Sequence, residues 1–178
     1  MAEARFQQLL QRNKNNLPPY ITPPPIQFLE TPQKKENGAI FIISCSDPRI
    51  EPADFLGLIK GEAGVIRVAG GRVEGQVLRG LEIMGSIAPI GLVVVMHHSD
   101  CGGLYRTDED VGMILAERNP GHVHVVEGKV FGTFGKLGLE GSIVDDVEKI
   151  KAWPFLPKFA AVKGYAFITE TGELKEVI

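Results

Sequence analysis

The stretch Ala39-Ile-Phe-Ile-Ile43 is a continuous apolar run that follows the turn-forming residues Glu36-Asn-Gly38. Two similar runs follow it, Gly64-Val-Ile-Arg-Val68, which contains one charged residue, and Gly91-Leu-Val-Val-Val-Met96, and Tyr165-Ala-Phe-Ile168 is a shorter fourth. Short unbroken apolar runs are typical of strands that are buried on both faces of a sheet. The four runs therefore predict the strands of a parallel sheet.

Helical patterns separate the predicted strands. The predicted helices cover residues 51–59, 76–87, 107–118 and 142–152. Thr107 and Asp110 have the spacing of a capping box at the start of the third helix. Ser142 is predicted to cap the fourth helix, with Asp145 and Asp146 as acids in its first turn. Strands that alternate with helices predict an α/β fold with a central parallel four-stranded sheet flanked by helices.

Two segments in the C-terminal half are less regular. Residues 174–177 follow a turn at Thr171-Gly-Glu173 and could return as an antiparallel edge strand. Residues 120–141 are rich in glycine, and we expect a loop, with short strands as the alternative. Phe131 and Phe134 of this segment could close over a pocket or pack on the sheet. In parallel sheets ligands bind beyond the carboxyl ends of the strands, so the residues that follow the apolar runs are the expected site.

The segment before the sheet has a different composition. Residues 5–11 have the pattern of a short amphipathic helix, and a proline-rich stretch that favours an extended arm follows it. The sequence thus predicts an N-terminal helix and arm over residues 1–38 and an α/β domain over residues 39–178. The arm could be a surface linker, or it could wrap a partner subunit, because Tyr20 and Phe28 need cover.

The composition excludes several classes of function. The 178 residues have a formal net charge of −3, with acids and bases mixed along the chain, which gives no basic surface for nucleic acid or lipid. No apolar stretch approaches the roughly 20 residues of a spanning helix. The first residues lack the apolar core of a secretory signal. We therefore expect a cytoplasmic protein that binds neither nucleic acid nor membranes.

Three potential metal ligands follow two of the predicted strands. Cys45 lies in Ser44-Cys-Ser-Asp-Pro-Arg49, and His98 and Cys101 lie in His97-His-Ser-Asp-Cys-Gly-Gly103. Neighbouring parallel strands would bring them to one crevice, and a zinc ion with three such ligands keeps a fourth position for catalysis. The alternatives are a disulfide, two buried apolar cysteines, or a redox pair, although no Cys-x-x-Cys is present.

These motifs resemble those of the β-class carbonic anhydrases, a family with relatives that hydrolyse carbonyl sulfide or carbon disulfide. Cys45-Ser-Asp47-Pro-Arg49 is similar to the family's Cys-x-Asp-x-Arg, and His98-Ser-Asp-Cys101-Gly102 is similar to its His-x-x-Cys-Gly. Val65-Ile-Arg-Val-Ala-Gly-Gly71 resembles the family block Val-Ile-Arg-Asn-Ala-Gly. The resemblance extends from about Ala39 to the C-terminus.

The resemblance implies a zinc ion bound by Cys45, His98 and Cys101, with Asp47 and Arg49 as a catalytic dyad beside it. The implied reaction is the reversible hydration of carbon dioxide to bicarbonate by zinc-bound hydroxide. Asp47 would orient the water and accept its proton, and Arg49 would keep Asp47 ionised. Without Arg49, Asp47 could itself bind the zinc and close the site. The resemblance also implies a homodimer or homotetramer.

Gly102, Gly103 and Val68 are predicted to contact the substrate. The N–H groups of the two glycines could approach an anion such as bicarbonate, and a tight turn is the alternative. Val68 stands where the family commonly has Asn, which makes the pocket more apolar. An apolar pocket favours carbonyl sulfide or carbon disulfide, whose hydrolysis gives carbon dioxide and hydrogen sulfide, as alternative substrates. A non-catalytic structural zinc protein is a further alternative.

Three histidines have no role in these motifs. His97 precedes the predicted ligand and is expected to be packed or to carry protons. His122 and His124 could form a second metal pair, one of them could shuttle protons, or both could be exposed loop residues.

Overall fold

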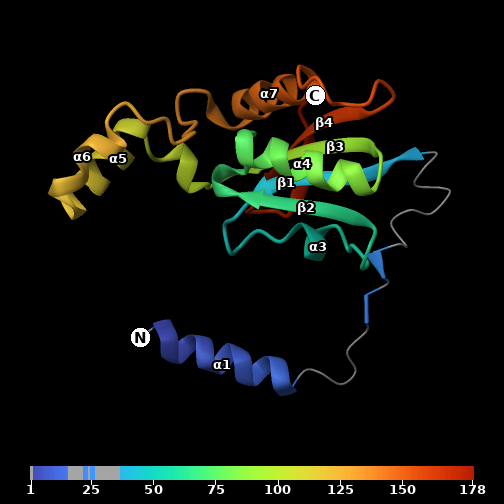
Figure 1. Ribbon diagram of the computed structural model, residues 1–178, viewed down its shortest axis with the longest axis horizontal. Helices are drawn as coiled ribbons and strands as arrows, with labels where there is room; N and C mark the ends of the chain where they lie inside the picture. The colour runs from blue at the N-terminus through green and yellow to red at the C-terminus, as the bar shows by residue number, and fades with distance from the viewer. Residues whose placement is uncertain (1, 16–21, 24, 27–36) are drawn as a thin grey trace.

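The computed structural model describes residues 2–15, 22, 23, 25, 26 and 37–178 (Figure 1). Its centre is a five-stranded sheet with the order β2-β1-β3-β4-β5. The strands are β1 (Ala39–Cys45), β2 (Ala63–Val68), β3 (Ile90–His98), β4 (Ala161–Ile168) and β5 (Glu173–Glu176). The first four pair in parallel, and β5 is antiparallel to β4. The predicted fold class and the antiparallel edge strand are confirmed.

Helices α4 and α7 cover one face of the sheet, and the short helix α3 lies on the other (Figure 1). The α-helices are α1 (Ala2–Asn15), α3 (Pro52–Phe55), α4 (Gly75–Ile87), α5 (Asp108–Arg118), α6 (Val123–Val126) and α7 (Gly138–Lys151). Within residues 39–178, the short 3-10 helices are η2 (Ala69–Gly71), η3 (Gly102–Leu104) and η4 (Pro120–His122). Two of them, η2 and η3, begin one residue after β2 and one residue after Cys101.

The alternation of side chains along β1 divides the core between the two faces of the sheet. Phe41 and Ile43 belong to the larger apolar cluster, which includes Leu81 of α4 and Val147 of α7. Ile42, between them, belongs to a smaller cluster on the face that carries α3. The strand is therefore buried on both faces, as its unbroken apolar run predicts.

The first helix after β1 is shorter than the sequence predicts. A helix was expected over residues 51–59, but α3 ends at Phe55, because Gly57 adopts a left-handed conformation (φ +63°) that cannot continue a helix. The predicted capping box of α5 is confirmed. Asp110 N donates to Thr107 Oγ1 (3.1 Å), and Thr107 N donates to Asp110 Oδ2 (2.9 Å).

The start of the last helix was predicted wrongly. Helix α7 begins four residues before Ser142, so this serine lies inside the helix and is fully buried. Its hydroxyl donates to the Leu139 carbonyl (2.8 Å), which satisfies a polar group that the apolar interior would otherwise penalise. The acids at 145 and 146 consequently lie in the middle of α7, and their role is different from the one expected at a helix start.

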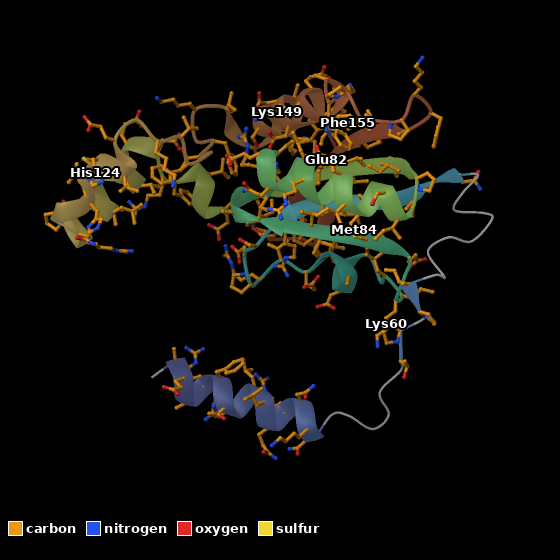
Figure 2. The ribbon with its side chains drawn as sticks, viewed as in Figure 1. Lys60, Glu82, Met84, His124, Lys149 and Phe155 are labelled. Atoms are coloured by element: carbon orange, nitrogen blue, oxygen red, sulfur yellow. The ribbon has the colours of Figure 1, made fainter. Side chains whose placement is uncertain are left out.

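Residues 120–141 contain short helices rather than strands. They include η4, α6 and the first turn of α7, and the segment 127–137 between them is irregular. Figure 2 shows α5 and α6 projecting from one end of the sheet, with His124 far from Glu82 on α4. This peripheral position agrees with the exposure of α5 and α6, because neither helix has a buried residue.

Helix α1 stands clear of the sheet in Figure 1. The predicted amphipathic helix over residues 5–11 is confirmed and is longer at both ends. All of its residues are exposed, including Phe6, Leu9 and Leu10. Most of the proline-rich arm, with Tyr20 and Phe28, lies outside the described residues. Within the described part of the chain, no helix combines the length and apolarity needed to cross a membrane.

Candidate metal centre

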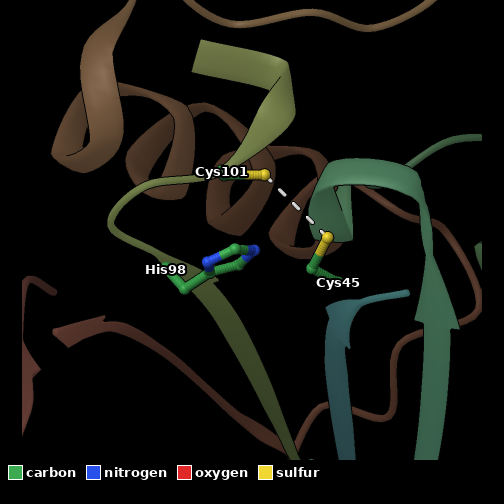
Figure 3. Close-up of side chains that lie close together, drawn as sticks. All are labelled: Cys45, His98 and Cys101. Atoms are coloured by element: carbon green, nitrogen blue, oxygen red, sulfur yellow. Dashed lines mark hydrogen bonds between the residues drawn. The ribbon is translucent and has the colours of Figure 1, made fainter. Parts of the chain in front are cut away.

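Cys45, His98 and Cys101 meet at the carboxyl ends of the adjacent strands β1 and β3 (Figure 3). Cys45 ends β1, His98 ends β3, and Cys101 follows a turn whose residue Asp100 has a left-handed conformation (φ +52°). One ligand atom from each of the three side chains lies within 4.8 Å of the others, and all three are buried. The two sulfurs are 3.9 Å apart, so the cysteines are free rather than disulfide-bonded.

The orientation of His98 fits a metal ligand. Its Nδ1 lies 2.7 Å from the Ser99 carbonyl, so Nδ1–H donates there and Nε2 keeps its lone pair. Nε2 is buried and has no hydrogen-bond partner. Ser99 is itself held by Thr169, whose N–H donates to Ser99 Oγ (2.8 Å). An unpartnered buried nitrogen beside two thiols is explained by a metal ion, and two thiolates with one imidazole suit zinc.

The pKa values of the two thiols are shifted in opposite directions. The pKa of Cys45 is lowered to about 4, chiefly because the Cys101 thiol donates a hydrogen bond to it, while burial opposes the shift. Its sulfur also accepts from the Asp47 N–H (3.3 Å). The pKa of Cys101 is raised, because its proton is held by the neighbouring Cys45 thiolate and because the group is buried. The pair therefore favours a thiolate at Cys45, and a metal ion would displace the proton of Cys101.

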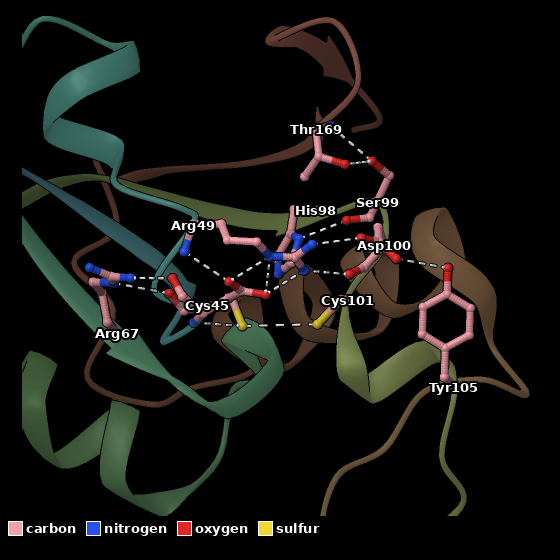
Figure 4. A network of polar contacts seen from close by, with 10 residues as sticks. Cys45, Arg49, Arg67, His98, Ser99, Asp100, Cys101, Tyr105 and Thr169 are labelled. Atoms are coloured by element: carbon pink, nitrogen blue, oxygen red, sulfur yellow. Dashed lines mark hydrogen bonds and ion pairs between the residues drawn. The ribbon is translucent and has the colours of Figure 1, made fainter. Parts of the chain in front are cut away.

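Asp47 and Arg49 form the ion pair that the sequence predicts, and Figure 4 shows the Arg49 side chain of this pair. Arg49 Nε donates to Asp47 Oδ1 (3.0 Å), and Nη2 donates to Oδ2 (2.7 Å). These bonds are the main cause that lowers the pKa of Asp47 to about 2. Asp47 is therefore ionised at neutral pH and follows a potential metal ligand by two residues.

Arg67 is a residue of this site that the sequence interpretation missed. From the adjacent strand β2, its Nε donates to the Cys45 carbonyl (3.0 Å) and its Nη2 to the Asp47 carbonyl (2.6 Å). Its Nη1 pairs with Glu51 (2.7 Å). The side chain therefore holds the loop after β1 at three points. A charged residue inside the apolar run 64–68 was the signal that could have found it.

The three predicted substrate contacts lie at the same end of the sheet. Val68 ends β2 directly opposite Cys45 in the strand register. Gly102 and Gly103 begin η3, and they differ in their surroundings. A Cβ at Gly102 would meet nothing within 4 Å, whereas one at Gly103 would lie 2.5 Å from the buried ring of Phe134. Gly103 thus has a packing role, and the buried Phe134 forms one apolar cluster with Cys45 and Cys101.

His97 and His98 are neighbours on β3, but they have different surroundings. His97 is fully buried, with Nδ1 2.8 Å from Ser142 Oγ and Nε2 3.2 Å from the Gly71 carbonyl. Its Nε2 also lies 3.3 Å from Asp146. The expectation that His97 is packed is confirmed by these contacts.

Asp146 is the centre of a buried ionic cluster that the sequence interpretation missed. Its carboxylate accepts from Arg72 Nη2 (3.1 Å), Val73 N (3.0 Å) and Lys149 Nζ (2.8 Å), and Arg72 Nε lies 2.8 Å away. Burial alone would raise the pKa of Asp146, but His97, Lys149 and Arg72 outweigh it and lower the pKa. The cluster joins α7 to the segment after β2 and to His97 of β3.

His122 and His124 lie away from this centre, on η4 and α6. Both are exposed, and their ring centroids are 6.2 Å apart. Within the described residues, Cys45, His98 and Cys101 are the one group of three or more such side chains that could hold a metal ion. The histidine pair therefore has no third ligand there.

Known proteins share both the sequence and the fold. Residues 40–126 match a family model described as carbonic anhydrase. The chain is 30% identical over 141 residues to β-carbonic anhydrase 1 of Mycobacterium tuberculosis, which covers 78% of this chain and 81% of the relative. It is 24% identical over 158 residues to a carbon disulfide hydrolase of Acidianus sp., which covers 79% and 78%.

Solved structures give the same result. The carbonic anhydrase of Streptococcus mutans matches with a TM-score of 0.81 and 26% identity over 97% of each chain. The carbonic anhydrase of Glaciozyma antarctica matches with a TM-score of 0.78 and 27% identity over 94% of this chain and 95% of that chain. A more distant match in fold is a β-carbonic anhydrase of Sordaria macrospora described as tetrameric, with a TM-score of 0.57 and 17% identity over 99% and 92%.

Proposed function

The chain belongs to the β-carbonic anhydrase family, and from that membership we propose that it is a zinc enzyme that hydrates carbon dioxide reversibly to bicarbonate. The observation that carries this proposal is the joint position of two elements. The buried cluster of Cys45, His98 and Cys101 lies at the ends of β1 and β3, and the ion pair of Asp47 and Arg49 follows Cys45 at the end of β1.

The three ligands would hold zinc through two sulfurs and His98 Nε2. When bound, the ion would supply a Lewis acid that makes hydroxide available near neutral pH to attack the carbon of carbon dioxide. Asp47, kept ionised by Arg49, would accept a hydrogen bond from the attacking water and orient it. Arg67 would keep the loop that carries Cys45 and Asp47 in place.

The second candidate reaction is the hydrolysis of carbonyl sulfide or carbon disulfide. Two observations favour it: the apolar Val68 opposite Cys45 at the strand ends, and the carbon disulfide hydrolases among the relatives. Water would replace sulfur on the substrate carbon. Carbonyl sulfide would give carbon dioxide and one hydrogen sulfide, and carbon disulfide would give carbon dioxide and two. Gly102 and Val68 are proposed to line the substrate position in either case.

We predict that the zinc-loaded protein forms bicarbonate faster than it releases sulfide. The test measures turnover of carbon dioxide, carbonyl sulfide and carbon disulfide on one sample whose zinc content is known. Asp47→Asn should keep the zinc and lower turnover by about 100-fold or more, because general acid–base groups contribute about 10²–10⁴.

The other outcomes of this assay are informative. Rapid sulfide release with little bicarbonate would reverse the order of the two reactions. If the unaltered chain and Asp47→Asn both bind a full complement of zinc and neither turns over any substrate, the result would favour a structural zinc protein.

We propose further that residues 1–38 form an arm that packs on a partner subunit, while residues 39–178 form the catalytic domain. The support is that α1 stands clear of the sheet with its apolar side chains exposed (Figure 1). An amphipathic helix gains most of its stability by burying such a face, and this chain leaves it bare. A homodimer or homotetramer would cover it.

Replacing Phe6, Leu9 and Leu10 together with serine is expected to shift the protein toward smaller species. Sedimentation velocity at several protein concentrations measures the change. A control with Gln8 and Gln11 replaced by serine alters the opposite side of α1 and should sediment like the unaltered chain. An unchanged profile for the triple variant would contradict the proposed role of the arm.

A further inference from the structure

Arg49 spans the two loops that carry the candidate metal ligands (Figure 4). On one side it binds the carboxylate of Asp47, two residues after Cys45. On the other side its Nη1 donates to Asp100 Oδ2 (2.7 Å), and its Nη2 donates to the Asp100 carbonyl (2.9 Å), one residue before Cys101. A single guanidinium group therefore ties the loop after β1 to the loop after β3.

Asp100 is itself held in a defined conformation. Among the described residues, it is the one non-glycine residue with a left-handed backbone (φ +52°). Aspartate tolerates this region better than most residues. Its second carboxylate oxygen accepts a hydrogen bond from Tyr105 Oη (3.1 Å), and the turn of η3, in which Tyr105 N donates to the Gly102 carbonyl (3.2 Å), places that tyrosine. Both oxygens of the Asp100 carboxylate are thus engaged.

The pair of Asp47 and Arg49 needs such a second anchor. The Arg49 side chain is 55% exposed, and an exposed ion pair alone holds its geometry weakly. The backbone of Asp47 already contacts a candidate metal ligand, because its N–H donates to Cys45 Sγ (3.3 Å). Carboxylates are good zinc ligands, so an Asp47 side chain released by Arg49 could occupy the metal position meant for water.

We propose that Asp100 is a positioning residue that fixes Arg49 on Asp47 and so keeps the Asp47 carboxylate away from the metal. Asp100 acts through Arg49 and has no contact with substrate. This inference rests on the proposed function, since it assumes that a metal ion occupies the site. It adds Asp100, with Tyr105 behind it, to the residues on which an open metal position depends.

Cobalt(II) in place of zinc tests the inference, because its absorption spectrum reports whether an added anion can enter the fourth position. Thiocyanate is expected to change the spectrum of the unaltered protein. Asp100→Ala should weaken that response about tenfold or more, since a charge-assisted contact to Arg49 is lost. Adding Asp47→Ala to that variant should restore the response, because the competing carboxylate is gone.

Two further variants sharpen the test. The Glu170 carboxylate accepts a hydrogen bond from Ser99 and has no described contact with Arg49. The Glu170→Ala variant removes this nearby negative charge and should respond to thiocyanate like the unaltered protein. Asp100→Asn keeps the left-handed conformation and one acceptor oxygen, and it is the variant to use if the alanine variant does not fold. It should weaken the response about threefold, because a neutral acceptor binds Arg49 less strongly than a carboxylate does.

A normal thiocyanate response in Asp100→Ala or Asp100→Asn would overturn the inference about Asp100 and leave the proposed function standing. A weakened response that Asp47→Ala does not restore would also overturn it, since the effect would not pass through Asp47. An unaltered chain that binds no cobalt would overturn the proposed function, and the inference with it.

Discussion

Replacing Asp146 with alanine is expected to lower the free energy of unfolding by about 3–5 kcal/mol, because it leaves the charge of Arg72 buried without its main partner. The Asp146 side chain is fully buried, and Arg72 is nearly so. Val73 N and Lys149 Nζ would lose acceptors in the same step. Urea unfolding at fixed protein concentration and fixed metal content measures the difference.

Asp145→Ala is the matched control for this prediction. Asp145 is the preceding residue of α7 and also binds Arg72 Nη2 (2.6 Å) and Lys149, but its side chain is 40% exposed. Water replaces such a partner, so the expected loss is about 1 kcal/mol or less. Equal losses for the two variants would show that burial at Asp146 does not decide the energy.

The effect of Asp146 should also depend on pH. The pKa of Asp146 is lower in the folded protein than its usual value near 4, so its contribution is fully present above that value. The contribution is lost as the pH falls through the lowered pKa. The difference in unfolding free energy between Asp146→Ala and the unaltered chain should therefore shrink in acid.

Replacing Cys101 with serine is expected to weaken zinc binding by more than about a hundredfold, since loss of only an outer partner of a metal ligand already costs about 10–100-fold. A serine hydroxyl keeps its proton at neutral pH and is a poor substitute for a thiolate. Competition with a chelator of known affinity measures the loss, and turnover should fall with zinc content. Ser44→Ala, next to Cys45 but on the opposite side of β1, should bind zinc normally.

Zinc binding should release protons and weaken as the pH falls. The Cys101 thiol has a raised pKa and is protonated in the metal-free protein, so it gives up about one proton to the buffer. At lower pH, where Nε2 of His98 also carries a proton, His98 releases another. Burial lowers its pKa, but the Cys45 thiolate outweighs this and raises it overall. Affinity should change about tenfold per pH unit for each proton released. Calorimetry in buffers of different ionisation enthalpy counts the protons, and unaltered release in Cys101→Ser would contradict the assignment.

Strong local patterns allowed much of the fold to be predicted from the sequence. The apolar runs located all four parallel strands, and Thr107 with Asp110 located the start of α5. Boundaries set by longer-range contacts were harder to predict. Serine is a common helix cap, but Ser142 lies inside α7, where its hydroxyl contacts His97 of β3. A single left-handed glycine at position 57 shortened α3.

The candidate site divides in the same way. Cys45, His98 and Cys101 lie just after apolar runs, so the predicted order of strands was enough to predict that they meet. Arg67, Asp100 and Asp146 were not found, because each acts on a partner that is distant in the chain. Asp100, for example, contacts Arg49 across 51 positions. Such pairs have no local pattern, and only the folded arrangement of the loops joins them.

The placement of all three ligands on the rim of a finished sheet has a consequence for biosynthesis. The larger apolar cluster is built from residues of β1, β3, α4 and α7 and contains none of the three candidate ligands, so we expect the scaffold to fold before any ion arrives. Small zinc domains, in contrast, acquire their structure only with the metal. Apoprotein made under zinc starvation would then be a folded reserve, ready for loading when the supply returns.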